Sequence, residues 1–105
     1  MPVTKIESAE QFNSTINSDK LVLVHFYADW CPPCRMIAPT VEAISNEFDG
    51  SLIVAKVNVD ELGEVSAEQR IECMPTFIFY KNGKKVDKVE GADEASVREL
   101  IGKHK

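Results

Sequence analysis

A nearly continuous apolar segment, residues 21–28, constrains the fold of this chain more than any other feature. Its sequence, LVLVHFYA, lacks the alternation of apolar and polar residues that marks a strand with one wet face. Such a segment is typical of a strand in the middle of a sheet that helices cover on both sides. We therefore expect an α/β protein with this strand at the centre of its sheet.

Length and charge narrow the choice further. The 105 residues suffice for one domain with its own core, so we expect a single domain over residues 1–105. Residues 1–7 lack the apolar centre of a secretory signal, and no apolar run approaches the roughly 18 residues of a membrane span. A cytoplasmic location without membrane attachment is expected. The net charge of -5 disfavours a nucleic-acid partner.

The remaining apolar runs alternate with amphipathic segments in the order βαβαβαββα. Strands are expected at residues 3–6, 21–28, 52–59, 76–80 and 84–90, and helices at about 9–17, 31–48, 61–70 and 94–103. Ser8 with Gln11 forms a capping-box pattern, and Asp60 is the expected N-cap of the third helix. Asn82-Gly83 predicts a hairpin between the last two strands. The result is a mixed five-stranded sheet flanked by four helices.

Helical spacing predicts the buried face of the second and fourth helices. In the second helix, Pro39 is expected to introduce a kink. The residues expected to face the core are Met36, Ile37, Val41, Ile44 and Phe48 in the second helix and Val97, Leu100 and Ile101 in the fourth.

The motif Trp30-Cys31-Pro32-Pro33-Cys34 opens the second helix and indicates a dithiol redox centre. A thiol at a helix start lies beside unpaired N–H groups and the positive end of the helix dipole, which favours its thiolate form. Cys31 is therefore the expected nucleophile. One helical turn brings Cys34 close to it, so Cys34 is the expected, more buried resolving thiol.

The alternative for this cysteine pair is a structural or zinc site. Zinc needs four ligands, and only Cys73, His25 and His104 remain, without a recognisable second pair. No metal or other cofactor is expected. Three cysteines also do not form the even-numbered framework of a disulfide-stapled secreted domain.

The element order, this motif and the segment Met74-Pro75-Thr76-Phe77 together resemble the thioredoxin family over essentially the whole chain. Residues 31–39 and 87–92 look most like the h-type cytosolic thioredoxins. The resemblance implies a thioredoxin fold and a general protein-disulfide oxidoreductase: Cys31 attacks a substrate disulfide, Cys34 resolves the mixed disulfide, and a thioredoxin reductase restores the dithiol. A glutaredoxin is a weaker match, because that family has Tyr or Phe between Pro and the second Cys.

A second function class is a non-catalytic binding module that uses redox state as a switch. Retention of both thiols, Trp30 and Pro75 favours the enzyme. In the resembled family this Pro follows a cis bond and packs opposite the dithiol, which turns the backbone of Met74 toward an extended substrate segment. With Trp30, the residues expected to line this shallow docking groove are Met74, Pro75, Gly91 and Ala92.

Three further positions are expected to tune the dithiol. Pro32, beside Pro33, stands where the family commonly has Gly; it either shifts the reduction potential or is a neutral variant. His25 stands where the family usually buries an Asp that helps to deprotonate the resolving thiol. Imidazole either takes over as proton acceptor, with an unperturbed pKa of about 6.5, or is a packed neutral side chain.

Cys73 directly precedes Met74-Pro75 and is expected at the rim of the groove. Cytosolic thioredoxins of animals carry a cysteine here that forms an intermolecular disulfide. We therefore expect a monomer that forms an oxidative homodimer through Cys73, with a spectator thiol as the alternative under reducing conditions.

Overall fold

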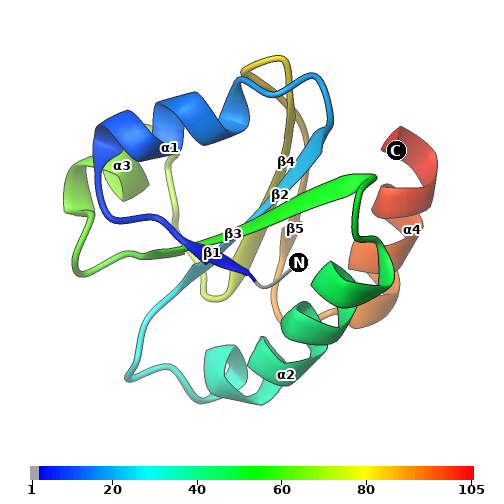
Figure 1. The fold of residues 1–105 in the computed structure, drawn as a ribbon. Coiled ribbons are helices and arrows are strands. Elements are labelled where there is room, and N and C mark those ends of the chain that lie inside the picture. Colours follow the sequence, from blue (N-terminus) through cyan, green and yellow to red (C-terminus); the bar gives the residue numbers. More distant parts are fainter. Residues whose placement is uncertain (1–2) are drawn as a thin grey trace.

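The computed structural model describes residues 3–105, and its elements follow the expected order (Figure 1). The strands are β1 (Thr4–Lys5), β2 (Leu21–Tyr27), β3 (Leu52–Asn58), β4 (Thr76–Lys81) and β5 (Lys84–Glu90). The helices are α1 (Ala9–Ile16), α2 (Pro32–Glu47), α3 (Gly63–Glu68) and α4 (Glu94–His104). The fold class expected from the sequence is confirmed.

The five strands form one mixed sheet in the order β1-β3-β2-β4-β5. β2 pairs in parallel with β3 and antiparallel with β4, so the apolar run lies at the centre of the sheet, as expected. The register pairs Tyr27 with Asn58, and the N–H of Val59 donates to the carbonyl of Tyr27 at 2.9 Å. The loops that follow β2 and β3 therefore leave the sheet side by side.

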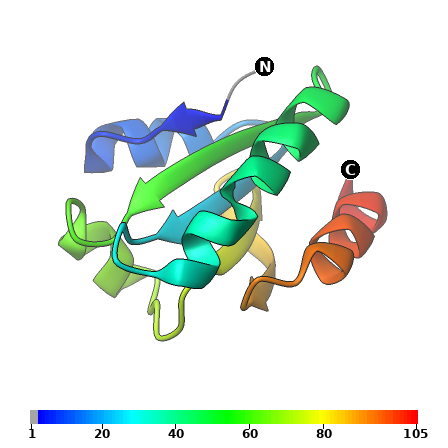
Figure 2. The same cartoon turned by 90° about the horizontal axis from the view of Figure 1, so that it is seen from below.

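Helices cover both faces of the sheet, with α1 and α3 on one side and α2 and α4 on the other (Figures 1 and 2). A hydrophobic core lies on each face of the sheet, and alternate β2 residues point into one or the other. Leu21 and Leu23 pack in the core with α2 and α4, whereas Val22 and Val24 pack in the core with α1 and α3. Burial on both sides explains why β2 has no polar face.

The start of α1 follows the capping prediction only in part. The Ser8 hydroxyl accepts the N–H of Gln11 at 3.0 Å, as a capping box requires. The Gln11 side chain, however, accepts from the N–H of Glu7 at 2.7 Å instead of from Ser8. The backbone N–H group that the Gln11 side chain accepts therefore belongs to Glu7, one residue before the N-cap Ser8.

The third helix differs from its prediction. It begins at Gly63 with Leu62 as N-cap and no side-chain cap, and it ends at Glu68. Asp60 is not the cap, because the Asn58 side-chain oxygen accepts the N–H groups of Asp60 and Glu61 at 2.9 and 3.3 Å and holds that segment as a turn. The segment 61–70 expected to be helical is thus shortened at both ends.

The apolar stripe of α2 is also narrower than expected. Ile37, Val41 and Ile44 are buried, but Met36 is 79% exposed. Met36 directly precedes the buried Ile37, and consecutive helix positions are about 100° apart, so the two side chains face different directions. Pro39 lies inside α2 as expected. The stripe of α4 holds, with Val97 and Ile101 buried and Leu100 packed beside them.

The hairpin between β4 and β5 turns at Asn82 and Gly83, as the Asn-Gly pair predicts. Both residues have positive φ, 55° and 79°, the conformation that a two-residue type I′ turn requires. The turn also rests on the end of α1, because Asn82 and Gly83 donate their N–H groups to the carbonyls of Ser18 and Ile16, each at 2.9 Å.

Candidate active site

The two clustered cysteines lie at the N-terminus of α2, at the edge of the sheet where β2 ends. Cys31 is the N-cap, and Pro32 and Pro33 begin the helix, where proline's missing N–H costs little. The N–H of Cys34 points at the Cys31 sulfur at 3.3 Å. The structure thus brings both thiols together, free and one helical turn apart.

Both thiols are buried, with 3% of Cys31 and 2% of Cys34 exposed. The expected contrast in burial is therefore not found, because Ala28, Tyr27 and Met74 pack around the pair. Cys34 differs in its proton affinity instead. Burial raises its pKa, and a hydrogen bond with Cys31 raises the pKa further. At neutral pH Cys34 is a protonated thiol.

Trp30 is held over the site by a partner that the sequence did not reveal. Its indole Nε1 donates to Asp60 Oδ2 at 2.8 Å, while 66% of the residue remains exposed. Arg35 steadies the same loop by donating to the carbonyl of Asp29 at 2.7 Å. The parallel pairing of β2 with β3 could have predicted the Trp30–Asp60 contact, since it places the loops after both strands at one edge of the sheet.

The groove residues on the other side of the dithiol also come together. Met74 packs against Cys31 and Cys34, and the Met74–Pro75 bond is cis, as the resemblance implies. The N–H of Gly91 donates to the carbonyl of Pro75 at 2.8 Å, which fixes the loop before α4 beside the Met74-Pro75 segment. Ala92 follows on this loop and is exposed.

His25 lies on the face of β2 that α2 covers and is 3% exposed. Its ring stacks on Phe77 with a centroid distance of 4.7 Å and an interplanar angle of 14°. Among the described residues, nothing pairs with its buried Nε2. Burial, followed by the positive charge of Lys56, lowers the pKa of His25 from 6.5 to about 4. The ring is therefore neutral at physiological pH.

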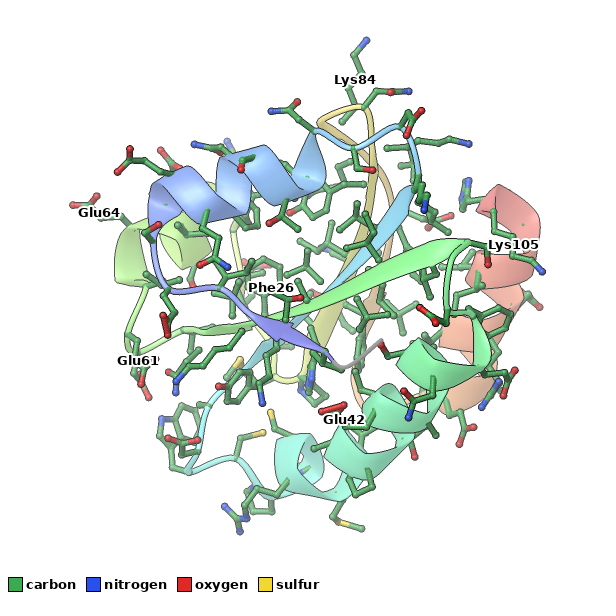
Figure 3. All side chains as sticks on the ribbon, viewed as in Figure 1. Phe26, Glu42, Glu61, Glu64, Lys84 and Lys105 are labelled. Carbon is green, nitrogen blue, oxygen red and sulfur yellow. The ribbon has the colours of Figure 1, made fainter. Side chains whose placement is uncertain are left out.

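A cavity of about 170 Å³ lies beneath the start of α2, and both His25 and Cys34 line it. Charged side chains at its margin are Lys56, Glu42, Asp29 and Arg35. Figure 3 shows the Glu42 side chain between α2 and β1. The predicted proton acceptor and the predicted resolving thiol thus face a common space.

The third thiol, Cys73, is exposed, and the backbone carbonyl of Cys73 accepts the Thr76 hydroxyl at 2.5 Å.

Within residues 3–105, no cluster of three or more His, Cys, Asp or Glu side chains is arranged to hold a metal ion. Nor does any helix of that part of the chain have the length and apolar character needed to cross a membrane.

Comparison with known proteins decides the family. The family profile described as Thioredoxin matches residues 3–103. This chain belongs to the thioredoxin family. Thioredoxin-1 of Saccharomyces cerevisiae is 46% identical over 99 residues, which span 94% of this chain and 95% of the yeast protein. Thioredoxin H4 of Arabidopsis thaliana is 46% identical over 94 residues, 90% of this chain and 79% of the plant protein.

Solved structures agree. The X-ray structure of Fasciola hepatica thioredoxin superimposes with a TM-score of 0.94 at 42% identity, covering 98% of this chain and all (100%) of that one. Malassezia sympodialis thioredoxin gives a TM-score of 0.93 at 41% identity over 99% of this chain and 94% of that one. The protein is accordingly a thiol-disulfide oxidoreductase that acts on protein disulfides, as the sequence predicted.

Proposed function

We propose that Cys31 is the nucleophile and Cys34 the resolving thiol of this oxidoreductase. The Cys31 thiolate attacks a substrate disulfide, which forms a mixed disulfide and releases one substrate thiolate. Cys34 then loses its proton and attacks the Cys31 sulfur. The Cys31–Cys34 disulfide forms, the second substrate sulfur leaves as a thiol, and two electrons have passed to the substrate.

One observation carries this assignment: the hydrogen bond from the Cys34 N–H to the Cys31 sulfur at the start of α2. The donated N–H and the helix N-terminus both place positive partial charge beside the Cys31 sulfur, which favours the thiolate form that attack requires. The raised pKa keeps Cys34 protonated until the mixed disulfide has formed.

A pair of single substitutions tests the assignment. We expect Cys31→Ser to abolish the reduction of insulin disulfides in the presence of a thioredoxin reductase, because no nucleophile remains. Cys34→Ser leaves attack intact and should trap the substrate as a mixed disulfide that mass spectrometry locates at Cys31. If Cys34→Ser traps no more substrate than Cys31→Ser does, the roles of the two thiols are wrong.

The surroundings support a docking role for the groove made by Trp30, Met74, Pro75, Gly91 and Ala92. Trp30 and Ala92 are exposed, and Met74, which packs against the dithiol, is half-buried. An extended substrate segment is expected to pair with the Met74 backbone as an added strand. We further propose a single domain over residues 1–105, a monomer in the cytoplasm, and a thioredoxin reductase as its electron donor.

The surroundings of His25 support a role for its ring in relaying the proton of Cys34. Its neutral ring carries a buried Nε2 without a protein partner, and the roughly 170 Å³ cavity is roomy enough for water to link it to Cys34. We propose that the proton leaves Cys34 through this ring and reaches the departing substrate thiolate. Pro32 and Pro33 tune the same dithiol through the rigid first turn of α2.

The pH dependence of mixed-disulfide resolution separates a relay from a packed spectator. We expect His25→Ala to slow resolution and His25→Asp to restore it with a different pH profile, because a buried carboxyl titrates at another pH. In the parent protein the acid limb should lie near pH 4, where His25 becomes charged, and not near 6.5. Superimposable profiles for the three proteins would exclude the relay.

A further inference from the structure

Met36 is the residue whose position departs furthest from the sequence prediction. It was expected in the core but is 79% exposed, two residues after Cys34. Within residues 3–105, the exposed large apolar residues are Trp30, Met36 and Val86. Two of these three lie within a few positions of the dithiol. Single exposed apolar residues are common on protein surfaces, so this observation needs a second one.

The second observation is a groove of about 230 Å³ beside Met36. Met36, Ile37 and Thr40 line it from α2, and Ala92 and Glu94 line it from the loop and first turn of α4. Both helices lie on the same face of the sheet (Figure 1). The groove therefore separates α2 from the start of α4 on the surface of the protein.

This groove adjoins the proposed docking groove at Ala92. Ala92 belongs to both, and the preceding Gly91 donates its N–H to the carbonyl of Pro75 at 2.8 Å. Pro75 in turn follows Met74, which packs against the two thiols. A substrate segment that lies along Met74-Pro75 has the Met36 groove within reach on the α2 side.

The size and lining of the groove indicate what fits. Its volume is below the roughly 300–1,000 Å³ of a typical small-molecule site, so it suits one side chain of a larger partner. Met36, Ile37 and Ala92 provide apolar walls, and Met in particular adapts to varied partners. Glu94 is the charged group of the lining.

The charge at this rim is negative after its internal ion pairs are counted. Arg98 bridges two carboxylates, with Nε 2.8 Å from Glu94 and Nη1 2.8 Å from Glu47. One cation thus faces two anions. The neighbouring Asp93 is exposed and adds another negative charge, since its hydrogen bonds with Ser96 lower its pKa. A cationic side chain with a long aliphatic stem matches both the apolar walls and this rim.

We propose that the Met36 groove binds a lysine or arginine side chain of the protein substrate, with the aliphatic stem on Met36 and Ala92 and the cation at Glu94. This subsite rests on the proposed docking of substrates along Met74-Pro75. It gives the enzyme a preference for disulfides that have a basic residue nearby.

The test uses peptide disulfides in which one lysine is moved stepwise along the segment that flanks the attacked cysteine. Each peptide has a norleucine counterpart, which keeps the stem and removes the ammonium group. Single-turnover rates of peptide thiol release by the reduced protein are compared. We expect one lysine position to react about three-fold faster than its norleucine counterpart, in line with an exposed ion pair, and this advantage to be lost in Glu94→Gln.

Met36→Ser should slow both peptides of that pair, whereas Val86→Ser and Glu99→Gln, matched exposed residues away from the groove, should change nothing. Glu94→Lys should reverse the preference toward a glutamate peptide. Equal rates for lysine and norleucine at every position, or a preference that survives in Glu94→Gln, would overturn the subsite. Reduction of a small disulfide without a peptide is the separate control: its failure in the parent would contradict the proposed function instead.

Discussion

At the scale of single residues, His25 shows how position alone changes chemistry. The same imidazole that titrates near 6.5 in a peptide is neutral here down to about pH 4, because it is buried and lies near Lys56. Besides Lys56, the titratable groups that line its cavity are Tyr27, Asp29, Cys34, Arg35 and Glu42. Stacking on Phe77 fixes the ring but supplies no hydrogen bond.

This shift makes the stability of the protein depend on pH. Because the pKa of His25 is lower in the folded than in the unfolded state, the unfolded chain takes up a proton first as the pH falls. Stability is thus fully present above about pH 6.5 and is lost toward pH 4, by about 2 kcal/mol at pH 5. His25→Phe removes the group and should flatten this loss.

The free energy of unfolding of each protein is measured by urea denaturation at about pH 7.5, 6 and 5. Acidic residues titrate equally in parent and variant, so the difference between the two curves reports His25. His104→Asn serves as the control and should keep the steep loss. Parallel curves for the parent and His25→Phe would show that the folded protein does not hold His25 neutral.

At the scale of elements, the sequence predicted all five strands and four helices, because their patterns are local. The prediction failed at α3 because of a side chain outside the helix. Asn58 accepts the N–H groups of Asp60 and Glu61, which holds this segment as a turn before the helix begins at Gly63. The hairpin was predicted correctly, yet its contact with α1 was not visible in the sequence. Because the turn packs against the end of α1, a side chain at position 83 is tolerated less well than at an ordinary turn glycine.

A matched pair of glycine substitutions checks this reading. Gly83 has a φ of 79°, and an added Cβ would lie 2.2 Å from Asn17 Oδ1, so Gly83→Ala should destabilise the protein by about 1–2 kcal/mol. Gly102, inside α4, has nothing within 4 Å of an added Cβ, so Gly102→Ala should stabilise it by about 0.5–1 kcal/mol. Thermal unfolding should move in opposite directions for the two variants; shifts of the same sign would contradict the account.

At the scale of the whole molecule, the fold separates its thiols by accessibility. The central sheet and α2 bury Cys31 and Cys34 in one cluster, while Cys73 stays exposed on the loop before β4. Oxidation is expected to close the clustered pair within the molecule, since the two lie one helical turn apart. Cys73 is then the thiol left for a bond to a second copy.

Mild oxidation of the purified protein should therefore yield a dimer that a reductant dissolves. On non-reducing gels and by size exclusion, Cys73→Ser should remain monomeric under the same treatment, and the double variant Cys31→Ser/Cys34→Ser should still dimerise. Dimers that persist in Cys73→Ser would mean that the active-site thiols form the intermolecular bond.

The fold class, the family and the clustered pair of cysteines could be predicted from the sequence alone. Strand 21–28, the motif at residues 30–34 and the Asn82-Gly83 turn act over a few neighbouring residues, and local patterns of this kind are written directly in the chain. Features that depend on contacts between distant segments became visible only in the three-dimensional structure. The Asp60 partner of Trp30, the neutral state of His25 and the exposure of Met36 beside α4 arise because the sheet and its covering helices bring residues tens of positions apart into one low-dielectric or open environment, which no local pattern encodes.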